Sequence, residues 1–429
     1  MARALVALQR GREVSSDTSA SRGYFALVFE ARLGPSLRYD ASQHWFEVPM
    51  PALPSLRFCS LGLIGLLLPA CVFAADVPPV PLKLDPELSD PGRPARARGE
   101  RYRGWVIDAL MHTDSGGFNE SNLPGVLEKS KVSGAVVMPT PNDGLSNRGS
   151  ALASTEQKLR LAGQAPDQAR ILCGGDYLTN MLADAQTFGR VTDLLTQRLQ
   201  RLAQDLDTTP CLGVGELGLM HFNKLGDQNV VYIRPDFPPL LEVVDQVGQR
   251  GGWIQLHAEP RDPAGNVSHH AELAQALALW TARQPRLRIM LSHTGMTSAA
   301  NARLILQSYP QVTMSIKLMS VNASGWRHLE PLLNADGDLY EDWAQLMEDM
   351  PDRFVIGSDA KFGASLKHSA ESETAYPQII SRFRRMLGSL EPSAARKIAQ
   401  GNARRLFGFP QRNSAPDAND AEAEMGAAR

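Results

Sequence analysis

The sequence predicts an α/β chain that folds as a (β/α)8 TIM barrel. Eight short apolar runs have the length of buried strands, and helical stretches separate them, which is typical of a parallel sheet with helical crossovers. Five of these runs lead into His, Asp or Glu, and in a barrel all five endings would lie at one mouth. A doubly wound open sheet is the alternative, but no GxGxxG turn follows the first strand. The expected strands are 105–109, 134–138, 170–174, 211–215, 253–256, 288–292, 312–316 and 354–357.

The stretches between these runs carry apolar residues at helical spacing. Before the fourth strand, residues 191–206 place Leu194, Leu195, Leu199 and Leu202 on one face. The body of the chain, residues 102–411, has about the size of one barrel with insertions. Comparable helical stretches precede the later strands at 240–247, 271–282, 300–307 and 339–350.

The strand endings supply the candidate functional residues, because side chains of these types act as metal ligands and as acids or bases. They are His112 and Asp114 after the first strand, Glu216 after the fourth, His257 after the fifth, His293 after the sixth and Asp359 after the eighth.

The first hundred residues differ from the body. Residues 58–75 carry no charge and end near Val72-Phe73-Ala74, which is the pattern of a secretory signal peptide with its cleavage site; an uncleaved anchor is the alternative. Leu68-Pro69-Ala70-Cys71 resembles a bacterial lipobox, so membrane attachment through an acylated Cys71 is a further alternative. We therefore expect export to the periplasm or cell envelope of a bacterium. The expected segments are 1–49 absent from the mature protein, 50–75 the signal peptide, 76–101 a Pro- and Arg-rich linker, and 412–429 a disordered tail.

Composition and charge exclude some classes of partner. The net charge of -2, with 43% hydrophobic and 21% charged residues, gives no reason to expect nucleic acid and leaves a small molecule as the expected substrate. Cys173 and Cys211 lie in apolar runs, so we expect two buried free thiols. No Gly-x-Ser-x-Gly motif is present, which argues against a serine hydrolase.

Several motifs resemble the amidohydrolase superfamily, and within it the amidohydrolase-related (amidohydrolase 2) group. Gln255-Leu256-His257-Ala258-Glu259 is similar to the fifth-strand signature of that group, Leu291-Ser292-His293-Thr294-Gly295 to the sixth, and Ile356-Gly357-Ser358-Asp359 to the eighth. Residues 401–407 are similar to its closing helix. Residues 213–219 are similar to the fourth strand of TatD-type deoxyribonucleases.

The first strand departs from the family pattern. Members of the family usually carry His-x-His there, but in direct register Leu110 stands at the first His position and His112 at the second. A shift by two residues would pair His112 with Asp114 instead, because alternate strand residues point to the same side. Both registers leave the expected ligand set incomplete.

The resemblance implies one divalent ion, with zinc as the first expectation and manganese or iron as alternatives. His112, His257 and Asp359 are the expected ligands, and Glu216, Asp114 or His293 would complete the set. Asp359 would orient or deprotonate a metal-activated water that attacks an amide, ester or lactone carbonyl, and His293 would shuttle the proton or bind the oxyanion.

Three basic residues are candidates for substrate binding. Lys317 ends the seventh strand, Lys361 follows the eighth, and Arg234 lies in the loop after the fourth. Exposure to solvent is the favoured interpretation for the two lysines, and Arg234 could instead cap the following helix. A metal-dependent decarboxylase remains open because an arginine at the mouth would suit a substrate carboxylate. A barrel that has lost catalysis and acts as an envelope binding protein also remains open, because Leu110 replaces a ligand.

Overall fold

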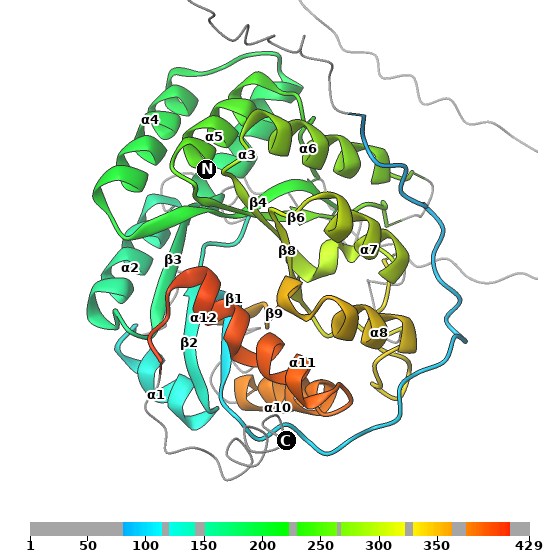
Figure 1. Ribbon diagram of the computed structural model, residues 1–429. Coiled ribbons are helices and arrows are strands. Elements are labelled where there is room, and N and C mark those ends of the chain that lie inside the picture. Colours follow the sequence, from blue (N-terminus) through cyan, green and yellow to red (C-terminus); the bar gives the residue numbers. More distant parts are fainter. Residues whose placement is uncertain are drawn as a thin grey trace, which may run out of the picture. The chain divides into compact units, whose positions relative to one another are not determined.

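The computed structural model describes residues 80–113, 120–141, 151–222, 230–263, 267–321, 329–362 and 375–411. Eight parallel strands in this part of the chain form a closed barrel, which confirms the predicted TIM barrel. Figure 1 shows the helices arranged around the strands. The strands are β1 (Val106–Thr113), β2 (Val132–Val137), β3 (Ala169–Gly174), β4 (Cys211–His221), β5 (Val231–Tyr232), β6 (Trp253–Ala258), β7 (Arg288–Leu291), β8 (Val312–Ile316), β9 (Phe354–Ile356) and β10 (Ala360–Phe362).

The barrel closes where β9 returns to β1. The strands follow the order β1-β2-β3-β4-β6-β7-β8-β9, and Asp108 of β1 then pairs with Ile356 of β9. Two short strands extend the mouth: β5 pairs antiparallel with the end of β4, and β10 pairs with the end of β1. Because the barrel strands are parallel, their carboxyl ends meet on one side.

The helices cover the barrel with apolar faces. In α4, Leu195, Leu199 and Leu202 are buried, and the side chain of Thr192 caps the helix by accepting from Leu195 N at 3.2 Å. Leu194, which we expected on the same face, is 46% exposed. The helices are α1 (Leu123–Lys129), α2 (Ala151–Gln164), α3 (Gly175–Thr187), α4 (Asp193–Thr208), α5 (Pro238–Gln249), α6 (His270–Arg283), α7 (Ala299–Ser308), α8 (Glu341–Asp349), α10 (Tyr376–Leu387), α11 (Pro392–Arg396) and α12 (Asn402–Phe407), with 3-10 turns η1 (Glu120–Asn122), η2 (Ser292–Met296) and η3 (Pro351–Arg353) and the π-turn η4 (Lys397–Gly401).

The barrel interior is a packed apolar core beneath the mouth. Leu110, Leu172, Trp253 and Met290 belong to one buried cluster that draws on several strands. Phe407 of α12 contacts Trp253 with ring centroids 5.0 Å apart. The interior is therefore filled by side chains, as in other barrels of this size, and the polar endings lie above it.

The described part of the expected linker, from Val80 onward, contacts the barrel. Arg93 Nη2 lies 2.8 Å from Glu330 Oε1, and Arg96 binds Glu341 at 2.7 Å and Glu348 at 2.9 Å. Charge pairs thus hold this stretch beside α8. The expected signal peptide and Cys71 lie outside the described residues, among which no helix is long and apolar enough to cross a membrane.

The expectation of two free thiols is wrong. Cys173 of β3 and Cys211 of β4 form a disulfide with their Cα atoms 6.0 Å apart. The two strands are neighbours, so parallel pairing brings the side chains together. Sequence alone could not show this, because it does not give the register between the strands.

Candidate metal centre

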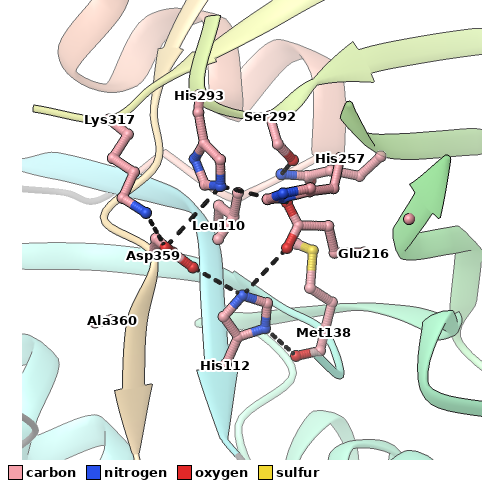
Figure 2. Close-up of polar contacts among 12 residues, drawn as sticks. Leu110, His112, Met138, Glu216, His257, Ser292, His293, Lys317, Asp359 and Ala360 are labelled. Atoms are coloured by element: carbon pink, nitrogen blue, oxygen red, sulfur yellow. Dashed lines mark hydrogen bonds and ion pairs between the residues drawn. The ribbon is translucent and has the colours of Figure 1, made fainter. Parts of the chain in front are cut away.

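Five polar side chains predicted from the strand endings converge at the barrel mouth (Figure 2). They come from β1, from β4, from β6, from the η2 turn after β7 and from the loop after β9. Four of them are buried, and the side chain of the fifth, Asp359, is 14% exposed. The residues are His112, Glu216, His257, His293 and Asp359.

His112 faces two carboxylates with one ring nitrogen. Nδ1 lies 3.0 Å from the carbonyl oxygen of Met138, and since a carbonyl can only accept, Nδ1 carries a proton. Nε2 lies 3.0 Å from Asp359 Oδ1 and 3.6 Å from Glu216 Oε2. The Nε2 of a neutral His112 offers these oxygens only a lone pair, so the three atoms need a proton or a cation between them. This donor set fits a divalent ion.

Glu216 reaches to both sides of the cluster. Its Oε1 lies 3.1 Å from His257 Nδ1 and 3.6 Å from His293 Nε2. Burial alone would raise the pKa of this carboxyl, but His257, His293 and His112 together hold the pKa well below its usual range. Gly175 of α3 leaves space for this part of β4, because a Cβ there would come within 2.2 Å of the Glu216 carbonyl oxygen.

Asp359 is fixed by a tight loop. Its backbone has φ 54°, and its N–H donates to Leu110 O at 3.0 Å. The preceding Ser358 N–H donates to Asp108 Oδ1 at 2.9 Å, so β1 anchors the loop after β9. Burial opposes ionisation of Asp359, but the Lys317 ammonium in contact with Oδ2 and the His112 ring hold its pKa well below the usual range. The expected exposure of Lys317 to solvent is thus replaced by an ion pair at the mouth.

His293 is the neutral imidazole of the cluster. Burial, with the nearby Lys317 charge, lowers its pKa to about 3. Its Nε2 lies 4.0 Å from Asp359 Oδ2, and Nδ1 is buried with no hydrogen-bond partner among the described residues. The ring is therefore neutral at neutral pH, with one N–H that can donate a hydrogen bond and one nitrogen that can accept one.

His257 is the cationic imidazole. Burial opposes its charge, but Glu216 and Glu259 raise its pKa to about 9. Its Nε2 lies 3.1 Å from Glu259 Oε1 and 2.8 Å from His221 Nδ1. No role was predicted for Glu259, although its spacing from His257 places both side chains on one side of the strand.

The remaining predicted residues divide into three outcomes. Leu110 is fully buried in the barrel interior while His112 reaches the mouth, which agrees with the direct register. Asp114 lies outside the described residues. Arg234 is 58% exposed and pairs with Asp236 at 3.2 Å, and Lys361 is exposed on β10.

Among the described residues, three sets of side chains have the spacing of metal ligands. They are His112, Glu216 and Asp359; Glu216, His257 and His293; and His221, His257 and Glu259, and within each set the ligand atoms lie within 4.8 Å of one another. The expected trio of His112, His257 and Asp359 is therefore divided, with Glu216 between its parts. Only the first and third sets have no member in common.

No family model and no curated protein matches the chain. Solved structures similar to it include a 2,6-dihydroxybenzoate decarboxylase from Rhizobium, with 12% identity, TM-score 0.43 and coverage of 72% of this chain and 99% of the other. A probable 2-pyrone-4,6-dicarboxylic acid hydrolase from Acinetobacter baumannii has 14% identity, TM-score 0.41 and coverage of 71% and 99%. A 4-oxalomesaconate hydratase from Rhodopseudomonas palustris has 11% identity, TM-score 0.42 and coverage of 75% and 99%.

Proposed function

We propose that this protein is an exported hydrolase that uses a divalent metal ion to cleave an amide, ester or lactone of a small molecule. The observation that carries the proposal is the set of His112, Glu216 and Asp359, in which two ionised carboxylates face one imidazole nitrogen. Two carboxylates compensate the charge of a divalent ion, and the proton on Nδ1 of His112 leaves Nε2 as the donor atom.

A bound divalent ion would lower the pKa of a coordinated water and polarise a substrate carbonyl. Asp359 would orient that water through Oδ2, the oxygen that also contacts Lys317, while Oδ1 faces His112 and the ion. His293, whose ring is neutral at neutral pH because burial lowers its pKa, would donate its N–H to the developing oxyanion or relay a proton through the ring. Lys317 places an ammonium beside Asp359, where it can bind a negatively charged group of the substrate or the developing oxyanion.

Hydrolysis is favoured over decarboxylation by the position of Arg234. A decarboxylase of aromatic acids would use this arginine to bind the substrate carboxylate. Arg234 instead pairs with Asp236 and is largely exposed. A binding protein without catalysis is less well supported, since five ligand-type side chains converge although Leu110 replaces one histidine.

Turnover by the purified mature chain tests the proposed reaction. After removal of metal by a chelator, the protein is supplied with zinc or manganese and assayed against small lactones, aryl esters and anilides. We expect added metal to restore hydrolysis in the wild type and in Glu272→Gln. In Glu216→Gln, added metal should not restore it. Glu272 is the matched control because its carboxylate contacts Tyr232 and His269 outside the three ligand sets. Release of carbon dioxide from dihydroxybenzoates without hydrolysis of any probe would instead establish the decarboxylase.

Export is the second part of the proposal. The apolar stretch 58–75 with its small-residue ending supports a cleaved signal peptide. The disulfide between Cys173 and Cys211 is compatible with an oxidising compartment. We expect N-terminal sequencing of the protein from its native cell to find a start after residue 70, in the envelope fraction. A cytosolic protein that retains residues 50–75 would rule out export.

A further inference from the structure

The third ligand set, His221, His257 and Glu259, lies beside the proposed catalytic ion. His221 ends β4, and His257 and Glu259 lie at the end of the neighbouring β6. Glu259 is fully buried, and its Oε2 accepts the Phe222 N–H at 2.8 Å, so the backbone holds the carboxylate in place. The His221 side chain is 21% exposed, which leaves an approach from solvent.

The three ligand atoms form a nearly equilateral triangle. His221 Nδ1 lies 2.8 Å from His257 Nε2 and 2.9 Å from Glu259 Oε1, and His257 Nε2 lies 3.1 Å from Glu259 Oε1. Zinc–nitrogen and zinc–oxygen bonds of about 2.0–2.1 Å place tetrahedral ligand atoms roughly 3.3 Å apart. The observed edges are close to this spacing.

Hydrogen bonds cannot satisfy all three edges of the triangle. If only one of the two nitrogens, His221 Nδ1 or His257 Nε2, carries a proton, the other presents its lone pair to the ionised Glu259 carboxylate about 3 Å away. With protons on both, two N–H groups meet at an N···N distance of 2.8 Å. A cation between the atoms accepts all three lone pairs at once.

We propose that His221, His257 and Glu259 hold a second divalent cation of the zinc type, separate from the catalytic ion. Two histidines and one glutamate are a donor set that zinc uses in proteins. The cation takes the Nε2 side of His257, and Nδ1–H of the same ring continues to donate to Glu216 Oε1 at 3.1 Å. The two sites share no ligand, so both can be filled together.

This cation would also join two parts of the mouth. β4 continues beyond the barrel to pair with β5, and His221 lies in that extension, opposite Val231. A bond from His221 to the ion shared with β6 fixes the extension to the barrel wall. It also fixes the ring of His257, and through it the carboxylate of Glu216.

Zinc content of the full-length mature chain tests this proposal without reference to activity. The chain is stripped of metal, dialysed to equilibrium against zinc, and analysed for bound zinc per chain. We expect about two equivalents in the wild type, one in His221→Ala, one in Asp359→Asn, and none in the double variant. His269→Ala is the matched control, because His269 forms a histidine–glutamate pair with Glu272 at 3.3 Å that lies outside the three ligand sets. It should keep two equivalents.

The same measurement separates failure of this site from failure of the catalytic ion. One equivalent in the wild type that persists in His221→Ala and is lost in Asp359→Asn would overturn the second site and leave the catalytic ion standing. Glu259 would then serve only to orient His257. One equivalent that is lost in His221→Ala and persists in Asp359→Asn would support the second site and remove the first. Circular dichroism establishes that each variant is folded, and the partly exposed His221 makes folding of its variant the expected result.

Discussion

Replacing Glu216 by glutamine removes one negative charge from the centre of the cluster and keeps the volume of the side chain. Oε2 of Glu216 lies 3.6 Å from Nε2 of His112, so the carboxylate is within reach of the proposed catalytic ion. Two unit charges about 4 Å apart interact by about 4 kcal/mol near a protein surface, and a divalent ion in direct contact interacts at least as strongly. About 4 kcal/mol corresponds to roughly a thousandfold in affinity, which is the minimum loss that we expect for zinc at this site.

Competition with a chromophoric chelator measures this loss for Glu216→Gln. Glu272→Gln is the control and should bind zinc as the wild type does, since Glu272 contacts Tyr232 and His269 instead of the cluster. The second cation should be retained in Glu216→Gln with its affinity reduced by roughly 10–100-fold, because His257 loses the partner of its Nδ1. If both zinc affinities of Glu216→Gln stay within about threefold of wild type, Glu216 is not a ligand and the proposed centre is wrong.

Three further predictions follow from the contacts of individual residues. His293→Ala should keep its zinc and lose roughly 10²–10⁴-fold in kcat, because the ring that binds the oxyanion or relays the proton is removed; an unchanged kcat would exclude this role. Leu110→His should bind zinc more tightly than wild type in direct metal titrations, while the metal-free variant should unfold about 1–3 kcal/mol more easily, because a polar ring enters the apolar interior. Burial raises the pKa of Asp108 to about 6, against the hydrogen bond from Ser358, so the folded protein favours its protonated form. The free energy of unfolding should therefore fall by about 3 kcal/mol as the pH rises from about 4 to 6, and in Asp108→Asn, measured by urea denaturation, this fall should be absent.

The barrel could be predicted because each of its strands is specified by a short stretch of its own sequence. A buried parallel strand is a short apolar run, and the position of His112, Glu216, His257, His293 or Asp359 at the end of such a run places it at the mouth. All eight expected strands occur, but β1 continues four residues and β4 six residues beyond the expected ends. The short strands β5 and β10 were not foreseen, because each depends on pairing with a neighbour instead of on its own composition.

The division of the ligands could not be predicted, because it depends on which side chains face each other across strands. Glu216 lies between His112 and His257 only through the register of β4 against its neighbours. His221 meets His257 because β4 continues past the barrel, and the sequence shows no sign of where that strand ends. The likeness of the β4 segment to TatD-type deoxyribonucleases stays a prediction, as does the identity of the metal.

The most direct test of the catalytic ion is anomalous diffraction at the zinc edge from crystals of the mature chain grown with zinc. We expect a peak between His112 Nε2, Glu216 Oε2 and Asp359 Oδ1, at about 2.0–2.2 Å from each atom. The peak should vanish in crystals of Asp359→Asn. Zinc-soaked crystals with no peak among these three residues, and a water or proton-mediated contact in its place, would contradict the account.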